Sequence, residues 1–359
     1  MNYSEREKRI IVADSLRELN YKQKKLLLAS EEESNPDREK YAAALIKIAG
    51  GGVYTKIKEK FRDLNYREGV LASLEKRKVA CVTVKSANYP ESLKQIEVPP
   101  LVLYLRGNAE LLGKRLFAVV GSRRTTAQIM AKCTEICSQL SESVAVVTGV
   151  ADGADSAAVK GGLKTGNIIC VLPGGHDGVG AANPRLLGEV EEKGLSISEF
   201  PPLTPAQKYT FVLRNRVIAG LAEGVLVVSA PDGSGALSTA GYAADYSKDV
   251  FAFPYNLGVP TGEGCNQLIK NGANLCTCPQ DILGAMGIKS QQKSVSLPKT
   301  GLDGDEDAVI KFLTEEGEQH AETIAARLQK TLTQTLTVCS MLEIKGLIVR
   351  VGGNKFAVI

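Results

Sequence analysis

The sequence predicts an α/β protein whose central domain is a doubly wound, mostly parallel sheet. Six short and almost continuously apolar runs support this fold, at residues 116–120, 144–149, 168–175, 195–200, 225–230 and 250–254. Strands that are apolar along their whole length are typical of a sheet covered on both faces. Longer helix-like segments separate the runs, which predicts parallel neighbours joined by right-handed crossovers. The chain has 359 residues, more than the ~150 typical of one domain, so we expect further domains.

Residues 1–80 predict a small helical domain. They are rich in strong helix formers, with apolar positions at Leu16, Leu19, Leu45, Ile46 and Ile48. Breaks fall at Asn35-Pro36 and at the three glycines 50–52, where a turn is the simpler interpretation than a phosphate-binding hairpin. Residues 81–115 are expected to connect this domain to the sheet, whose domain is predicted over 116–288.

The carboxy-terminal segment predicts a third domain after a linker. Residues 289–304 are polar and contain Pro and Gly, as expected for an interdomain linker. Three short helices are predicted at 305–315, 321–330 and 332–344, followed by a hairpin with its turn at Gly352-Gly353-Asn354. This order of elements predicts a winged helix over 305–359.

Composition excludes several classes of protein. Hydrophobic residues make up 44% and charged residues 23%, as in ordinary globular proteins. There is no apolar run of the ~20 residues needed to span a membrane, and the charged start does not suit a signal peptide, so we expect a cytoplasmic protein without a membrane partner. Eight scattered cysteines without a CxxC pair predict a reducing compartment and no metal site.

Net charge gives no overall attraction for polyanions. Lys and Arg exceed Asp and Glu by five in residues 1–80, but the counts are equal in 101–290 and the net charge of 291–359 is −1. With only His176 and His320 as imidazoles, acid–base chemistry has few candidate groups. A nucleic-acid interface would therefore need cations that gather locally.

Glycine-rich loops follow the predicted strands, at the sheet edge where ligands bind in this fold class. The loop at 121–126 combines a glycine, hydroxyls, Arg123 and Arg124 before a helix start, which favours phosphate binding over a simple helix cap. The loop at 148–155 leads into a helix of small residues, where ligand approach and close helix packing are equally good explanations. The loop at 173–177 holds His176, which we expect to be incidental, since no nucleophile is placed beside it.

The segment 208–221 is the most informative stretch. Lys208, Phe211, Arg214 and Arg216 cluster at a helix start, and an aromatic ring beside guanidinium groups suits a single strand. The structural alternative makes Phe211 a core anchor and Arg214 a partner of Glu199 or Asp177. Another glycine and hydroxyl loop follows at 232–240.

Two nucleotide-binding motifs are missing. The sequence has no GxxxxGK(S/T) and no GxGxxG after the first strand of the sheet. P-loop NTPases and dinucleotide cofactors are therefore disfavoured, and we expect no cofactor.

Six motifs together resemble the DNA-processing protein A family, also called Smf. They are GSRRT (121–125), TGVADGAD (148–155), SEFPP (198–202), FVLRNRVIAGL (211–221), SGALSTA (234–240) and EGCNQLIKNGA (263–273). The resemblance spans about 116–285. It implies a Rossmann-like domain, and the flanking helical domain (SAM- or helix-hairpin-helix-like) and the winged helix fit longer family members.

The resemblance implies a non-enzymatic protein without catalytic residues. It would bind single-stranded DNA, protect incoming DNA, self-associate as a homodimer and load the RecA recombinase during natural transformation. The implied DNA contacts are Ser122, Arg123, Gly149, Lys208, Phe211, Arg214, Asn215, Ser234 and Gly235, while Arg216 has a structural role. Asp152 stands where the family motif has an arginine, which removes one positive contact.

Two other functions remain as alternatives. Pro173-Gly174-Gly175 is similar to the start of the PGGxGTxxE pattern of nucleotide phosphoribohydrolases of the lysine-decarboxylase-like group, but the Thr and Glu of that pattern are missing here. A transcription factor would use the winged helix to read duplex DNA. Because the predicted recognition helix carries few cations, a protein contact or a packing role suits that domain better.

Overall fold

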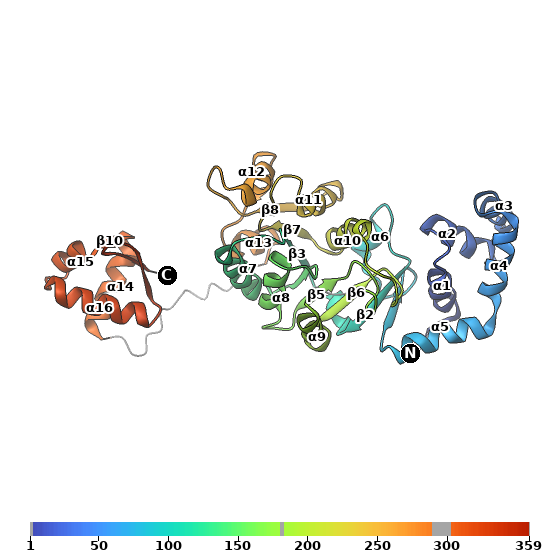
Figure 1. Ribbon diagram of the computed structural model, residues 1–359, viewed down its shortest axis with the longest axis horizontal. Helices are drawn as coiled ribbons and strands as arrows, with labels where there is room; N and C mark the ends of the chain where they lie inside the picture. Colours follow the sequence, from blue (N-terminus) through green and yellow to red (C-terminus); the bar gives the residue numbers. More distant parts are fainter. Residues whose placement is uncertain (1–2, 180–182, 289–302, 359) are drawn as a thin grey trace. The chain divides into compact units, whose positions relative to one another are not determined.

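The computed structural model (Figure 1) describes residues 3–179, 183–288 and 303–358. The chain divides into two compact units, Met1–Ser290 and Gln291–Ile359. Most of the segment predicted as a linker, 289–304, lies outside the described residues.

A nine-stranded sheet forms the centre of the first unit, in the order β1-β2-β6-β5-β4-β3-β7-β8-β9. Neighbours from β6 to β9 pair in parallel, whereas β2 is antiparallel to β1 and β6. The strands are β1 (Ala80–Thr83), β2 (Val102–Gly107), β3 (Leu116–Val120), β4 (Ala145–Thr148), β5 (Ile168–Val171), β6 (Leu195–Ser198), β7 (Gly224–Val227), β8 (Asp249–Ala252) and β9 (Asn274–Leu275). The predicted mostly parallel α/β sheet is confirmed, and the six apolar runs correspond to β3–β8.

Strands β1 and β2 lie in the segment that we predicted to be a connection. They pair in register from Ala80 opposite Leu105 to Thr83 opposite Val102, and α6 (Glu91–Lys94) lies between them in sequence. The apolar run at 101–105 was a signal for β2. It was missed because no alternation of strand and long helix surrounds it.

Helices cover both faces of the sheet, as Figure 1 shows, and each face has its own apolar core. One face packs against α6, α10 (Lys208–Leu221), α11 (Gly235–Asp245) and α12 (Glu263–Lys270). The other packs against α7 (Ala127–Leu140), α8 (Ala154–Gly162), α9 (Pro184–Lys193) and α13 (Pro279–Ala285). In the part of the first unit that the structure describes, two 3₁₀ turns also lie between these elements, η1 (Ala109–Gly113) and η2 (Pro260–Gly262).

The small residues of α8 serve helix packing. A Cβ at Gly161 would lie 2.6 Å from both the Thr134 carbonyl oxygen and the Cys137 Cβ of α7. Of the two explanations for this helix, close packing is therefore the one seen at Gly161.

Between residues 3 and 79, five helices precede the sheet. They are α1 (Glu5–Ser15), α2 (Tyr21–Ser30), α3 (Arg38–Ala49), α4 (Gly51–Arg62) and α5 (Leu64–Lys76). Of the apolar positions in this segment, Leu16, Leu19 and Leu45 are buried, whereas Ile46 and Ile48 are 40% and 49% exposed. The difference arises because α3 turns only one stripe of its surface toward its neighbours.

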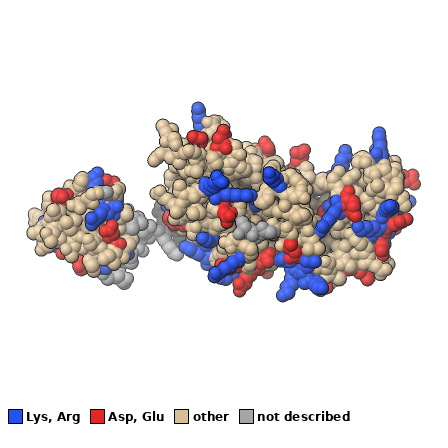
Figure 2. All heavy atoms as spheres, viewed as in Figure 1, with Lys and Arg blue, Asp and Glu red and all other residues tan. Residues whose placement is uncertain are grey.

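Charges of both signs are spread over the surface. On the face of the first unit seen in Figure 2, Lys and Arg side chains lie over the sheet and over the helices before it, with carboxylates between them. A binding site for a polyanion must therefore be identified from local groups of cations rather than from the whole surface.

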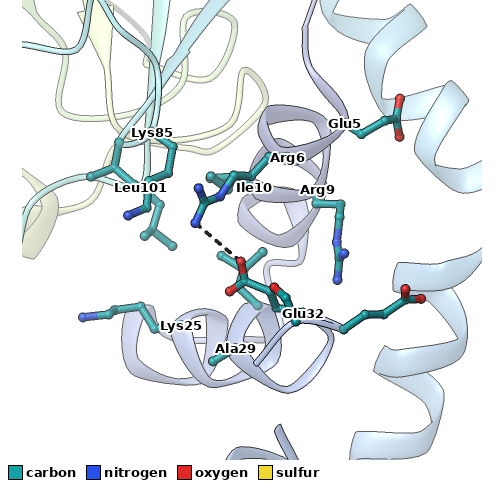
Figure 3. Close-up of a pocket in the computed structure, with 13 residues that line it drawn as sticks. Glu5, Arg6, Arg9, Ile10, Lys25, Ala29, Glu32, Lys85 and Leu101 are labelled. Carbon is teal, nitrogen blue, oxygen red and sulfur yellow. Dashed lines mark hydrogen bonds and ion pairs between the residues drawn. The ribbon is translucent and has the colours of Figure 1, made fainter. Parts of the chain in front are cut away.

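A pocket of about 580 Å³ lies between α1, α2 and the ends of the β1–β2 pair (Figure 3). Ile10, Leu28 and Leu101 contribute apolar walls, and Arg6 pairs with Glu32 at 3.4 Å. Four cations and three carboxylates line it, so its charges nearly balance and it does not favour an anion.

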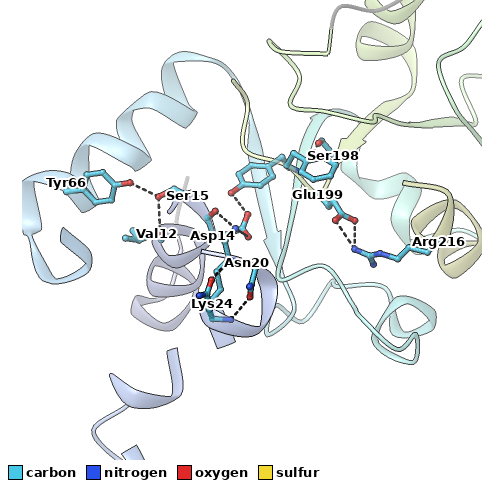
Figure 4. A network of polar contacts seen from close by, with 12 residues as sticks. Val12, Asp14, Ser15, Asn20, Lys24, Tyr66, Ser198, Glu199 and Arg216 are labelled. Carbon is cyan, nitrogen blue, oxygen red and sulfur yellow. Dashed lines mark hydrogen bonds and ion pairs between the residues drawn. The ribbon is translucent and has the colours of Figure 1, made fainter. Parts of the chain in front are cut away.

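Polar and apolar contacts fix the helices to the sheet. Ile10, Ile11 and Leu74 share a core with Val102 and Tyr104 of β2. Figure 4 shows the adjoining polar network, in which the Tyr104 hydroxyl donates to Asp14 Oδ2 at 2.8 Å. Lys24 Nζ donates to the other oxygen of that carboxylate at 2.9 Å. The helices α1 and α5 are thus a fixed wall beside β2.

The second unit has the three predicted helices followed by the predicted hairpin, with a short strand, β10, that was not predicted between the first two helices. It consists of α14 (Gly304–Glu316), β10 (Gln319–His320), α15 (Ala321–Arg327), α16 (Leu332–Ile344), β11 (Ile348–Gly352) and β12 (Lys355–Val358). The three strands form a separate sheet in the order β10-β12-β11. Phe356 and Ile348 of the hairpin pack on the three helices, as in a winged helix.

Within the ranges that the structure covers, we find no helix with the length and apolar character needed to cross a bilayer.

Candidate nucleic-acid interface

A pocket of about 400 Å³ opens at the carboxyl ends of β3 and its neighbours. Strand β3 pairs with β4 on one side and with β7 on the other, so this is the point where the strand order reverses. In open parallel sheets, ligands bind at such a point. We call this concavity the β3 pocket. The residues that line it are Val120, Gly121, Ser122, Arg123, Arg124, Ala151, Asp155, Phe211, Arg214, Asn215, Ile218, Ser234, Gly235, Ala236 and Thr239.

Backbone contacts fix the loop that carries Arg123. The Ser122 N–H donates to the Ser229 carbonyl oxygen at 2.8 Å, across from the end of β7. The loop before α8 packs directly beneath, at Gly153, where φ is +75° and a Cβ would lie 2.5 Å from the Ser122 carbonyl oxygen. Only glycine fits there. Arg123 itself is exposed, with its guanidinium carbon 4.9 Å from the centroid of the Phe211 ring.

Helix α10 brings Phe211 and Arg214 to the pocket from the other side. The Gln207 N–H donates to Thr210 Oγ1 at 2.9 Å and fixes the helix start. Arg214 follows Phe211 by three positions, so both project from one helix face. Phe211 is partly exposed, whereas Arg214 is only 6% exposed.

Arg214 lies beneath the pocket as a buried cation. Its Nη1 donates to the Val171 carbonyl oxygen at the end of β5, at 2.9 Å, and its Nε donates to Asn215 Oδ1 at 3.2 Å. Burial lowers the pKa of Arg214, which the negative charge of Asp155 opposes. Burial also raises the pKa of Asp155, while Arg214 and a hydrogen bond from the Ala151 N–H pull it down.

Gly149 leaves the space in which this buried pair meets. A Cβ at this position would overlap Arg214 Nη1 and Asp155 Oδ2. Gly149 is buried and does not line the pocket. Its contribution to the site is to let the guanidinium approach the end of β4.

The start of α11 closes the pocket. The Ser234 hydroxyl caps this helix by accepting from the Ala236 N–H at 3.3 Å, and Gly235 and Ala236 line the cavity. Asn215 Nδ2 donates to the Gly235 carbonyl oxygen at 3.2 Å and to Ser238 Oγ at 2.8 Å. A helix amino terminus favours an anion, which adds to the effect of the arginines.

Seven of the nine predicted contact residues meet at this pocket, and two do not. Lys208 is exposed at the first position of α10, outside the lining, and Gly149 lies behind it. Sequence reasoning did not single out Asp155 and Thr239, which also line it. Asp155 had a detectable signal, because it follows a glycine loop at a strand end.

The expected ion-pair alternative for Arg214 was wrong. Glu199 pairs with Arg216, whose Nη2 lies 2.6 Å from Glu199 Oε2 and whose Nη1 donates to the Val98 carbonyl oxygen. Asp177 pairs instead with Arg77 and Arg106. Side chains two positions apart on a helix point to different faces. Arg216 therefore faces Glu199, which the sequence suggested as a partner of Arg214.

The loop at 173–177 owes its glycines to packing. A Cβ at Gly174 would lie 2.9 Å from both the Ala206 nitrogen and the Thr204 carbonyl oxygen, and one at Gly175 would overlap Pro201 and Pro202. His176 is 6% exposed, and its Nε2 is 3.4 Å from the Ser196 carbonyl oxygen. The two glycines that this loop shares with the phosphoribohydrolase pattern are thus explained by packing, since the loop lies backbone to backbone against the loop after β6.

All eight cysteines are unpaired, and all but Cys278 are buried. Across residues 3–179, 183–288 and 303–358, no group of three or more His, Cys, Asp and Glu side chains is placed to hold a metal ion.

Each of the two units matches a known protein family. Residues 80–287 match the family described as DNA recombination-mediator protein A, and residues 295–354 match the DprA winged helix domain. The first match covers more than half of the chain. The chain belongs to the DNA recombination-mediator protein A family.

Relatives of this family match both sequence and fold. DNA processing protein DprA of Bacillus subtilis is 36% identical over 220 residues, which are 59% of this chain and 73% of that protein. The X-ray structure of DNA processing protein A from Streptococcus pneumoniae superposes with a TM-score of 0.65 at 31% identity, covering 79% of this chain and 98% of that one. The Helicobacter pylori protein, whose structure addresses its single-stranded DNA binding mode, gives a TM-score of 0.53 at 26% identity, over 58% of this chain and 95% of that one.

We predict that Gly149→Ala displaces Arg214 from its buried position. The new methyl group overlaps the guanidinium, so we expect a loss of about 1–3 kcal/mol of unfolding free energy. Urea denaturation measures this loss. Gly188→Ala is the matched control, because Gly188 lies within α9 with open space around its Cα, and there alanine should stabilise the helix by up to ~1 kcal/mol. Equal stabilities of the two variants would contradict this role of Gly149.

We predict that His176 makes the folded state sensitive to acid. Burial, with a smaller contribution from the Arg106 charge, lowers the pKa of His176 to about 4. The unfolded chain binds this proton near pH 6.5, so stability is lost as pH falls from about 6.5 to 4, by up to about 3 kcal/mol.

Urea denaturation between pH 7 and pH 4 compares wild type with His176→Gln. The variant should lose less stability on acidification. His320→Gln is the control, because the His320 side chain is 56% exposed, and it should follow the wild-type curve. Parallel curves for wild type and His176→Gln would refute the assignment.

Proposed function

We propose that this chain is a single-stranded DNA-binding mediator of recombination whose β3 pocket binds the DNA backbone. One observation carries the proposal: Arg123, Arg124 and Arg214 meet Phe211 and the start of α11 in one cavity at the β3 switch point. Guanidinium groups and a helix amino terminus suit phosphates, and an aromatic ring suits an unpaired base. The H. pylori relative is described with a single-stranded DNA binding mode, which supports the same ligand here.

Within this proposal Arg123 and Phe211 act together. The guanidinium already lies over the ring, so a base that stacks on Phe211 displaces it or stacks beside it. Displacement frees the guanidinium for a neighbouring phosphate. Arg214 contributes charge from beneath, and Ser122, Asn215, Ser234 and Gly235 shape the cavity around the strand. Lys208 adds a cation at the start of α10.

The proposed role is non-enzymatic, and it assigns no catalytic residue and no cofactor. By family resemblance, the protein protects incoming DNA, self-associates as a homodimer and loads RecA during natural transformation. We propose the cytoplasm as its location, because eight unpaired cysteines suit a reducing compartment.

For the winged helix we propose a protein contact. The predicted recognition helix, residues 331–345, has one cation, Lys345. Its Nζ lies 2.6 Å from Glu306 Oε2, so its charge is engaged. Met341 and Ile344 are 47% and 81% exposed on α16. An apolar surface of this kind favours protein over duplex DNA.

We predict that Arg123→Ala weakens binding of single-stranded DNA about tenfold and lowers the salt dependence. The slope of log affinity against log salt should fall by about 0.7 for each lost phosphate contact. Gel shifts with single-stranded and duplex oligonucleotides across a salt series measure both. Arg115→Ala is the matched control, because Arg115 precedes β3 at the opposite sheet edge and pairs with Glu223.

A second variant separates charge from stacking. Phe211→Ala should weaken binding without changing the slope, since it removes a stacking surface worth ~1–3 kcal/mol but no charge. If Arg123→Ala binds as tightly as Arg115→Ala, the β3 pocket is not the DNA site.

A further inference from the structure

We propose that a groove along α5 is a second contact surface for the backbone of the same single strand. The inference rests on the proposed function and extends the site beyond the β3 pocket. The groove consists of two adjoining concavities of about 440 and 550 Å³, which share Gly69, Ser73 and Arg77. We call it the α5 groove.

The charge of the α5 groove is strongly one-sided. Arg17, Lys76, Arg77 and Arg106 line it, and Asp177 is the one carboxylate among its lining residues. The pocket between α1 and α2, by comparison, balances four cations with three carboxylates. Of these two large concavities around the N-terminal helices, only the α5 groove complements a polyanion.

Asp177 orients two of these cations and offsets one of their two charges, and Glu191 Oε2 lies 3.9 Å from Arg106 Nη1. Arg77 Nη1 and Arg106 Nη2 each lie 2.6 Å from a different oxygen of this carboxylate. Burial alone would raise the pKa of Asp177, but the hydrogen bonds from the two arginines lower it below its usual value. Each guanidinium has five N–H donors, so both keep donors for a phosphate while their positions are fixed.

The groove continues the edge on which the β3 pocket lies. The carboxyl ends of β3, β4, β5 and β6 follow one another along this edge, because these strands are parallel neighbours. The loops after β5 and β6 bind each other, with the Asp177 N–H donating to the Pro202 carbonyl oxygen at 2.8 Å. Pro201, Pro202 and Leu203 line the groove.

The same loop then leads to the first site. It passes through exposed Lys208 into α10, which supplies Phe211 and Arg214 to the β3 pocket. In Figure 2, Lys and Arg side chains lie both over the sheet and over the helices before it. A strand leaving the β3 pocket past β5 and β6 therefore meets the α5 groove.

The groove is suited to phosphates rather than bases. The Lys60 ammonium lies 4.9 Å from the centroid of the Tyr66 ring, and the Tyr66 hydroxyl bonds Ser15 Oγ at 3.1 Å. Tyr104 is 1% exposed. Tyr104 is thus closed to a base, and Tyr66 is held by Lys60 and Ser15, so the cations of the groove should make the contact, which should be electrostatic and independent of sequence.

The test compares two strand lengths and two double variants of the full chain. Arg17→Glu with Lys76→Glu reverses two exposed cations of the groove. Lys22→Glu with Lys56→Glu is the control, with the same charge change on exposed residues of α2 and α4 that line neither site. Oligothymidylates of about 6 and about 20 nucleotides, within and beyond one site length, are titrated by fluorescence anisotropy.

We expect the groove variant to bind the longer strand at least about tenfold more weakly than the control variant, and the shorter strand within about twofold of it. Equal binding of the longer strand by the two variants would overturn the α5 groove. Equal weakening for both lengths would overturn it too, because the loss would then be a general field or folding effect. Failure of the wild type to bind either strand would instead refute the proposed function itself.

Discussion

The burial of the Arg214 guanidinium beneath the sheet edge is the interaction on which the site depends. An unpaired buried charge costs several kcal/mol, and here the cost is offset by contacts from three directions. The end of β5 accepts a hydrogen bond through Val171, the neighbouring Asn215 accepts another, and Asp155 at the start of α8 supplies the opposite charge. Gly149 must lack a side chain for the guanidinium to reach this position. The contacts of Arg214 therefore hold the ends of β4 and β5, the start of α8 and the helix α10 in one arrangement.

This arrangement gives the pocket its shape before any ligand arrives. With Arg214 fixed, the preceding turn of α10 presents Phe211 at the cavity, and Gly153 holds the loop of Arg123 opposite it. A preformed site avoids the entropic cost of ordering loops when a strand binds. The direction of the strands brings the remaining residues together, because the loops that follow parallel strands lie at the same edge of the sheet. For the same reason the loops after β5 and β6 continue this edge of the sheet as far as α1 and α5, the fixed wall beside β2.

Much of this could be predicted from the sequence, for identifiable physical reasons. The apolar runs fixed β3–β8, since strands buried on both faces leave an unbroken signal, and the glycine loops after them located the edge. The antiparallel β1 and β2 were missed because only alternation with long helices marks a strand clearly in this fold class. The exposure of Ile46 and Ile48 could not be predicted, because residue type alone does not show which stripe of a helix is covered.

Side-chain partners were harder to predict than positions. Arg214 and Arg216 are two residues apart and look alike in sequence, yet one lies beneath the pocket and the other binds Glu199. Asp155 and Gly149 contribute to the site through their contact with the Arg214 guanidinium. This contact forms only when β4, α8 and α10 pack together, so the sequence alone does not show it. Likewise, the α5 groove combines residues from α1, α5, β2 and two loops, so no single sequence motif predicts it.

Photochemical crosslinking of the full chain to a single strand carrying 5-iodouracil tests the central claim most directly, because it reports which residues touch the bases. Peptide mapping should place adducts at Phe211 or elsewhere within residues 208–215, at the β3 pocket. Adducts confined to the winged helix, residues 303–358, with none between residues 116 and 288, would contradict the account.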